Sequence, residues 1–220
     1  MTGANKQEVL KPTGARARLE ALPGERQAQL LDPAEAEFVA HGFERASLNR
    51  ILAAAGMSKG QAYYYFADKA DLYRAVIERG LTRLASAIGE DFPAPETADE
   101  FWKQISEIFV RMALVLQQDE HLAALARGIY EGGGAQAALV EPIDRIRTYL
   151  DRLILIGQSV GAVRTDLPQT LLAEVMFGAA REIDRWFAEH WPELNEEEAL
   201  RLSEKSIDMI IAMASPRTLV

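Results

Sequence analysis

The chain contains no cysteine among its 220 residues, which excludes disulfide bonds and thiolate ligands for a metal ion. It also has no run of about 18 apolar residues, the length that a membrane-spanning helix needs. Its first 20 residues lack the apolar segment of a secretory signal. From these absences we expect a cytoplasmic protein that has no contact with a membrane and carries no cofactor or metal.

Residue patterns typical of catalytic sites are missing as well. The three histidines, His41, His121 and His190, are far apart in the sequence, and none belongs to a nucleophile motif. The sequence has no P-loop, no Rossmann glycine pattern and no HExxH motif. We therefore expect the protein not to be an enzyme.

Basic residues are outnumbered by acidic ones, but unevenly along the chain. The net charge of −9, taken alone, argues against a nucleic-acid partner. Residues 1–90, however, hold 12 Lys and Arg against 11 Asp and Glu, whereas residues 91–220 hold 12 against 22. Residues 45–69 contain four basic side chains and one acidic side chain: Arg45, Arg50, Lys59, Lys69 and Asp68. A DNA duplex is therefore attracted to this short segment and repelled elsewhere.

Helical periodicity is present in nearly every segment, and no convincing run alternates apolar and polar residues as strands do. The sequence predicts an all-α protein. Caps and apolar stripes indicate about nine helices, the first of them kinked or broken at Pro33. They cover residues 24–40, 48–54, 58–65, 68–88, 97–116, 120–130, 136–160, 169–190 and 195–214.

Two of these helices are short and meet at Gly56, and each is preceded by a serine that caps it, Ser47 and Ser58. Helices of about seven residues are unstable alone, so they must pack on a third helix, and one face of the second stays free. This arrangement is typical of a helix-turn-helix. The candidate DNA-contacting residues are Ser47, Ser58, Lys59, Gly60, Gln61, Tyr63, Tyr64, Tyr65 and Lys69.

The chemistry of that face suits DNA. Gln61 can pair with adenine, and Lys59 can contact guanine or phosphate. Gly60 allows close approach of the backbone, while the tyrosine hydroxyls and Lys69 suit phosphate oxygens. Each residue also has an explanation that does not involve DNA. The tyrosines can be surface packing, the lysines can be solvated charges, and the serines can simply be helix caps. Their joint spacing is what favours DNA binding.

Residues 30–72, LLDPAEAEFVAHGFERASLNRILAAAGMSKGQAYYYFADKADL, resemble the DNA-binding domain of the tetracycline-repressor (TetR) family without a gap. The resemblance rests on these features: Phe38, Gly42-Phe43, Ser47, Ile51, Ala54-Ala55-Gly56, Ser58-Lys59-Gly60, Tyr63, Tyr65-Phe66, Lys69 and Leu72. The sequence departs from the family pattern at Pro33, at Glu37 where an apolar residue is usual, at Ala62 which is small, and at Tyr65 which replaces histidine.

The resemblance implies three regions: a flexible tail over 1–22, a helix-turn-helix DNA-binding domain over 23–70, and a helical effector-binding and dimerisation domain over 71–220. It implies a homodimeric transcriptional regulator, a repressor released from a palindromic DNA operator by a small-molecule effector. The last two helices would form the dimer interface. The alternative is a helical interaction protein that has lost operator binding.

An effector pocket in such a protein lies between the connecting helix and the dimer helices. Its candidate lining residues, each of which is also a candidate core residue, are Phe101, Trp102, Phe109, Met112, Tyr130, Tyr149 and Phe177, with Trp186 beside them. The charged neighbours Arg181 and Glu182 fit either a ligand contact or the surface.

Overall fold

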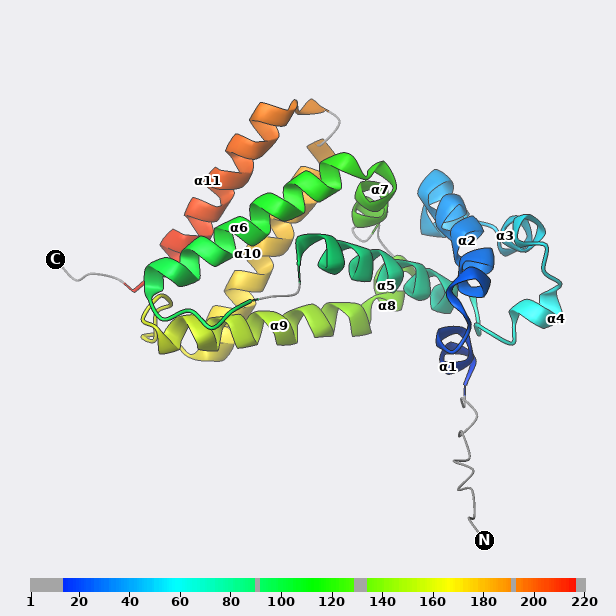
Figure 1. Cartoon of the computed structure of the whole chain (residues 1–220), viewed down its shortest axis with the longest axis horizontal. Coiled ribbons are helices and arrows are strands. Elements are labelled where there is room, and N and C mark those ends of the chain that lie inside the picture. Colours follow the sequence, from blue (N-terminus) through cyan, green and yellow to red (C-terminus); the bar gives the residue numbers. More distant parts are fainter. Residues whose placement is uncertain (1–13, 90–91, 129–133, 191–192, 217–220) are drawn as a thin grey trace, which may run out of the picture.

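The computed structural model describes residues 14–89, 92–128, 134–190 and 193–216. Within these ranges it is helical throughout, with no strand, which confirms the all-α prediction. The helices are α1 (Ala15–Glu20), α2 (Gly24–Arg45), α3 (Leu48–Ala55), α4 (Lys59–Ala62), α5 (Lys69–Ile88), α6 (Ala98–Gln118), α7 (Glu120–Gly128), α8 (Gly134–Ala138), α9 (Val140–Ser159), α10 (Gln169–His190) and α11 (Glu196–Ala214). Figure 1 shows α1–α4, which we call the head, at one end, and α6–α11, which we call the body, at the other, with α5 between them.

The described ranges hold eleven helices rather than about nine, because α1 and the short α8 are additional. The expected flexible tail over 1–22 is wrong for residues 15–20: they form α1, and Leu19 is buried against the head. Residues 1–13 lie outside the described part of the chain.

Pro33 does not break the first long helix. Helix α2 continues through Pro33, and its only non-helical backbone angles occur at Gly42, where φ is +66°. Leu30 on one side of the proline and Ala34 and Phe38 on the other are buried in the same core, so packing keeps both segments in one helix. A break at Pro33 is therefore excluded, and the helical backbone angles are interrupted at Gly42 instead, where glycine tolerates a positive φ.

One hydrophobic core joins the head to α5, α7 and α8. The aromatic ring of Tyr73 on α5 packs edge-on against Phe38 at 4.9 Å between ring centres and against Phe43 at 5.1 Å. Leu125 of α7 and Leu139 after α8 belong to the same buried cluster. The core of the head thus continues into α5, α7 and α8.

A buried carboxylate fixes α2 against α5. Glu35 is 4% exposed, and its two oxygens accept hydrogen bonds from Arg79 at 2.6 Å and from Arg83 at 2.9 Å. Arg79 also donates to Asp32 at 2.6 Å. A buried charge is tolerated only when it is paired and hydrogen-bonded, so this network holds the two helices in one relative position.

A second core lies in the body, among α6, α9, α10 and α11. Its buried members include Phe101, Ile154, Met176 and Ile210. Gly157 on α9 is required here, because an added Cβ would collide with the side chains of Val163 and Phe101.

Glu37 connects α2 to the start of α3. The carboxylate accepts hydrogen bonds from the backbone N–H of Ser47 at 2.8 Å and from Nε of Arg50 at 2.9 Å. The hydrogen bond from Arg50 lowers the pKa of the Glu37 carboxyl below its ordinary value. An acid is therefore retained at a position where the family pattern has an apolar residue, and it orients α3 on α2.

We predict that Glu37→Gln lowers the free energy of unfolding by about 1–2 kcal/mol at pH 7, after allowance for the solvent exposure of Arg50. Because the folded-state pKa is depressed, this stabilisation is complete above the ordinary glutamate pKa of about 4.3 and disappears as the pH falls through the folded-state value. Urea denaturation of both proteins between pH 3 and 7 measures it.

The matched control is Glu25→Gln, since the Glu25 carboxylate has no hydrogen-bond partner among the described residues. Its effect should stay below that of Glu37→Gln at neutral pH. A difference between wild type and Glu37→Gln that is the same at pH 3 and pH 7 would contradict the assigned role.

Candidate nucleic-acid interface

The helix-turn-helix is present where the sequence predicts it. Helix α3 ends at Gly56, which adopts the left-handed conformation at φ +63°, and α4 begins after Ser58. The second helix is shorter than expected: α4 ends at Ala62 instead of about Tyr65. A turn follows, in which the N–H of Tyr65 donates to the carbonyl of Ala62 at 2.8 Å.

Burial separates the two faces of this motif. Ala62 and Phe66 are almost fully buried and pack with Ile51 of α3 in the core of the head. The opposite face is exposed to solvent along a continuous stretch that consists of Ser58, Lys59, Gly60, Gln61, Tyr63 and Tyr64. Tyr63 is 45% exposed and Tyr64 is 55% exposed, which is unusual for side chains of this size.

Lys59 is the free cation of this exposed face. Its side-chain ammonium makes no hydrogen bond or ion pair with any described residue. A side chain in this state keeps all three of its donors for a partner.

Gln61 already has a structural role. Its Oε1 accepts hydrogen bonds from the backbone N–H of Ser58 at 2.9 Å and from the Ser58 hydroxyl at 3.0 Å, while the Ser58 hydroxyl accepts from the N–H of Gln61. These bonds form a capping box that starts α4. A bidentate contact to adenine uses both Oε1 and Nε2, so it would have to replace part of this cap.

Lys69 and Ser47 are also engaged within the protein. The Lys69 ammonium donates to the carbonyl of Glu44 at 3.1 Å and to that of Ala46 at 3.5 Å, and it lies 4.7 Å from the centre of the Phe43 ring. The Ser47 hydroxyl accepts from the N–H of Arg50 and caps α3. Lys69 therefore holds the end of α2, with one ammonium donor left for a phosphate.

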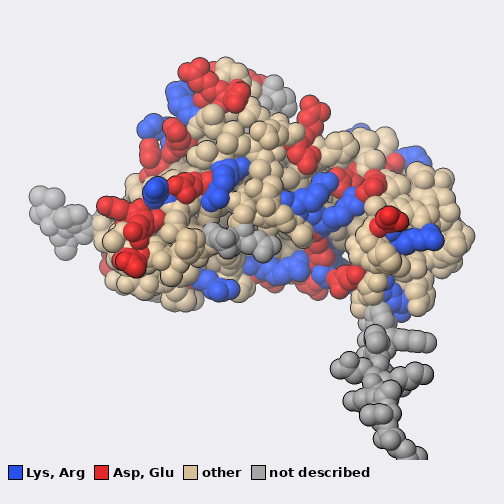
Figure 2. Space-filling model, in the orientation of Figure 1, with Lys and Arg blue, Asp and Glu red and all other residues tan. Residues whose placement is uncertain are grey.

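The charge count of residues 45–69 overstates the free positive charge. Arg50 is paired with Glu37, which lies outside that window in the sequence. Arg45 donates to the carbonyl of His41 at 3.3 Å. In Figure 2 the head shows separate basic groups on a mainly uncharged surface, whereas acidic side chains gather over the start of α11 and near the start of α6.

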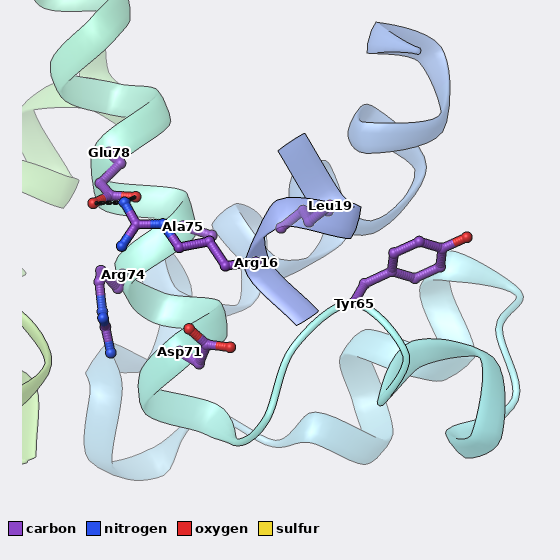
Figure 3. Close-up of a pocket in the computed structure, with 7 residues that line it drawn as sticks. All are labelled: Arg16, Leu19, Tyr65, Asp71, Arg74, Ala75 and Glu78. Atoms are coloured by element: carbon purple, nitrogen blue, oxygen red, sulfur yellow. Dashed lines mark hydrogen bonds and ion pairs between the residues drawn. The ribbon is translucent and has the colours of Figure 1, made fainter. Parts of the chain in front are cut away.

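The sequence did not indicate Arg18, which lies beside this surface. Its Nε donates to the carbonyl of Tyr64 at 2.8 Å, and its guanidinium carbon lies 4.2 Å above the centre of the Tyr64 ring. Residues Ala15 to Glu20 favour a helix and are flanked by Gly14 and Pro23. This pattern could have indicated helix α1, which carries Arg18. Tyr65, unlike Tyr63 and Tyr64, is half-buried. It lines a small pocket together with Leu19, as Figure 3 shows.

The predicted effector residues are not gathered around one described cavity. Phe101 is a core residue that packs edge-on against Trp102 at 4.9 Å. Tyr149, by contrast, is 49% exposed. Phe109 and Met112 are half-buried, as is Phe177, which lies 4.4 Å from the guanidinium of Arg147, whereas Tyr130 lies outside the described residues.

The described residues contain no group of three or more His, Cys, Asp or Glu side chains that could hold a metal ion. Among the helices of the described ranges, none is both long enough and apolar enough to cross a membrane.

Comparison with known proteins points to one family. Residues 30–76 match the family model described as "Bacterial regulatory proteins, tetR family". The activator FasR of Mycolicibacterium smegmatis is 36% identical over 86 residues, which cover 39% of this chain and 39% of that protein. The repressor AcnR of Corynebacterium glutamicum is 30% identical over 69 residues, covering 31% of this chain and 37% of that protein. The chain thus matches less than two-fifths of these relatives' length.

Similarity in fold covers much more of the chain than the similarity in sequence does. A putative TetR-family regulator from Syntrophomonas wolfei superposes with a TM-score of 0.69 at 19% identity, over 86% of this chain and 95% of that one. FadR of Bacillus subtilis, solved in complex with stearoyl-CoA, gives a TM-score of 0.64 at 18% identity, over 85% and 98% of the two chains. Residues 30–76 are thus similar in sequence to the DNA-binding part of TetR-family regulators, and the rest of the chain shares their fold.

Proposed function

We propose that this protein is a sequence-specific DNA-binding transcriptional regulator that inserts α4 and the following turn into the major groove. The observation that carries the proposal is the exposed face from Ser58 to Tyr64, which includes an unpaired lysine and two exposed tyrosines. Ammonium and hydroxyl groups are suited to phosphate oxygens and base edges. A regulator of this kind acts on DNA in the cytoplasm and needs no catalytic group.

The rival function is a helical interaction protein whose head no longer binds DNA. Such a protein would have no reason to keep Lys59 unpaired or to expose Tyr63 and Tyr64 together. The exposed face therefore favours DNA binding over this alternative.

We propose further that a small molecule bound in the body releases the protein from its operator. The head shares its core with α7 and α8, so a movement of the body helices is transmitted to the head. A ligand that prefers one position of the heads shifts the population towards it, and the coupling is reciprocal between ligand and DNA. The relatives include an activator and a repressor, and we propose repression as the first mode to test.

An apolar effector suits the second half of α6. Only Phe101 and Ile105 of that helix are fully buried, while apolar residues further along, such as Phe109, Met112 and Leu116, are half-buried. These side chains leave apolar surface to be covered. Binding of stearoyl-CoA by the B. subtilis neighbour is consistent with an apolar ligand in this fold.

We propose that the protein forms a homodimer through α10 and α11, and exposed apolar side chains on both helices support this. Leu171, Val175 and Gly178 lie on one face of α10 at the spacing of helix turns, and Leu171 and Val175 are exposed large hydrophobics. Met209 is exposed on the neighbouring α11. Two copies packed through these faces would cover them in a four-helix bundle.

The direct test is selection of binding sites from random duplex DNA with the purified full chain. We expect enrichment of a palindrome, with half-sites about 34–36 Å apart or a multiple of that spacing. Failure to enrich any sequence, at salt concentrations where other duplex-binding proteins do so, would favour the interaction-protein alternative.

We predict that Lys59→Ala weakens binding to the selected duplex and reduces the slope of log K against log salt by about 0.9, the value for one phosphate contact. Lys103→Ala removes the same charge from an exposed site on α6 and serves as the control. Fluorescence anisotropy titrations between 50 and 200 mM salt measure both slopes. Equal slopes in the two variants would refute a phosphate contact by Lys59.

Val175→Glu should dissociate the dimer, because a carboxylate placed without a partner in an apolar interface costs about 2–4 kcal/mol. Analytical ultracentrifugation reports the dissociation constant. Val140→Glu is the matched control, since Val140 is an equally exposed valine at the start of α9. A dimer that survives Val175→Glu as well as it survives Val140→Glu would place the interface elsewhere.

A further inference from the structure

Arg18 is held against the DNA-contacting face by two separate interactions with one residue. Its Nε donates to the Tyr64 carbonyl at 2.8 Å, and its guanidinium carbon lies over the Tyr64 ring, 4.2 Å from the ring centre. A guanidinium has five N–H donors, and Nε carries only one of them. The two terminal nitrogens, with four donors, bond to no described residue.

Helix α1, which carries Arg18, is fixed to the rest of the molecule. Arg16 donates to both oxygens of Glu78 on α5, at 2.7 and 2.8 Å, and to Glu141 on α9 at 2.8 Å. Leu19 is buried in the core of the head. Figure 3 shows Arg16 extended towards Glu78, with Leu19 lining the same small pocket. Arg18 is therefore positioned before any partner arrives.

The side chain is also placed beside the surface that meets DNA. Tyr64 follows α4 directly and is more than half exposed. Arg18 is half-buried, and its charge is not neutralised by any carboxylate among the described residues, unlike Arg16, Arg50 and Arg79. An unpaired cation held rigidly next to the recognition element loses little conformational entropy when it binds an anion.

We propose that Arg18 clamps a phosphate of the DNA backbone, so that α1 extends the DNA interface beyond the helix-turn-helix. The planar fork of terminal nitrogens matches phosphate oxygens in a bidentate arrangement. Tyr64 then positions the Arg18 guanidinium through its carbonyl and its ring, in addition to contacting DNA itself. This inference rests on the proposed DNA-binding function.

The test compares the wild-type chain with Arg18→Gln and Arg18→Lys on the duplex selected by the wild type. Arg18→Gln keeps an amide donor for the Tyr64 carbonyl but removes the charge. We expect it to lose about 3- to 10-fold in affinity at 0.15 M salt and about 0.9 in the salt slope. Arg18→Lys keeps the charge, so we expect it to retain the slope and lose less affinity.

Arg152→Ala, which removes an exposed arginine from α9, is the control and should leave the slope unchanged. A loss of affinity in Arg18→Gln with an unchanged slope means that Arg18 only supports Tyr64, and this overturns the proposal. Unchanged affinity overturns it too. If the wild type itself shows no salt-dependent duplex binding, the proposed function fails first, so the two failures are distinguishable. Circular dichroism melting of each variant verifies that α1 and the head remain folded.

Discussion

The structure depends on the inability of α3 and α4 to fold alone. With eight and four residues they lie below the length at which an isolated helix is stable, so their geometry comes entirely from packing. That packing is supplied by α2 and α5, and it continues without a boundary into α7 and α8. The surface proposed to meet DNA is therefore supported by the body, and a rearrangement of the body helices can reach it through the same core.

Carboxylates convert this apolar packing into a defined orientation. Glu35 fixes α2 to the connecting helix α5, and Glu37 fixes α2 to the start of α3. Arg16 adds a link from α1 to α5 and α9. Apolar contacts are non-directional, whereas each of these ion pairs has one good geometry. Together they make the head and α5 move as one body, which is what an effector needs if it is to change the separation of two heads on DNA.

Features set by neighbours in the sequence could be predicted, and features set by distant partners could not. The bounds of α5, α10 and α11 and the caps at Ser47 and Ser58 follow from local signals and are confirmed. Helix α1 was missed because it is stabilised by contacts with residues about 60 to 125 positions away, such as Glu78 and Glu141. Helix α2 is not broken at Pro33, because the core on both sides of the proline holds both segments in one helix. For the candidate DNA-contacting residues, the exposure of Lys59, Tyr63 and Tyr64 was predictable, but the engagement of Gln61 in a cap was not.

The central claim is that DNA is bound by the face of α4 and the turn after it. Amide hydrogen exchange of the full chain, with and without the duplex that it selects, tests this most directly. We expect protection on DNA binding to be concentrated in residues 47–66, with added protection in α1, and no such change over the exposed side of α11. Unchanged exchange over residues 47–66 together with protection of another surface would contradict the account.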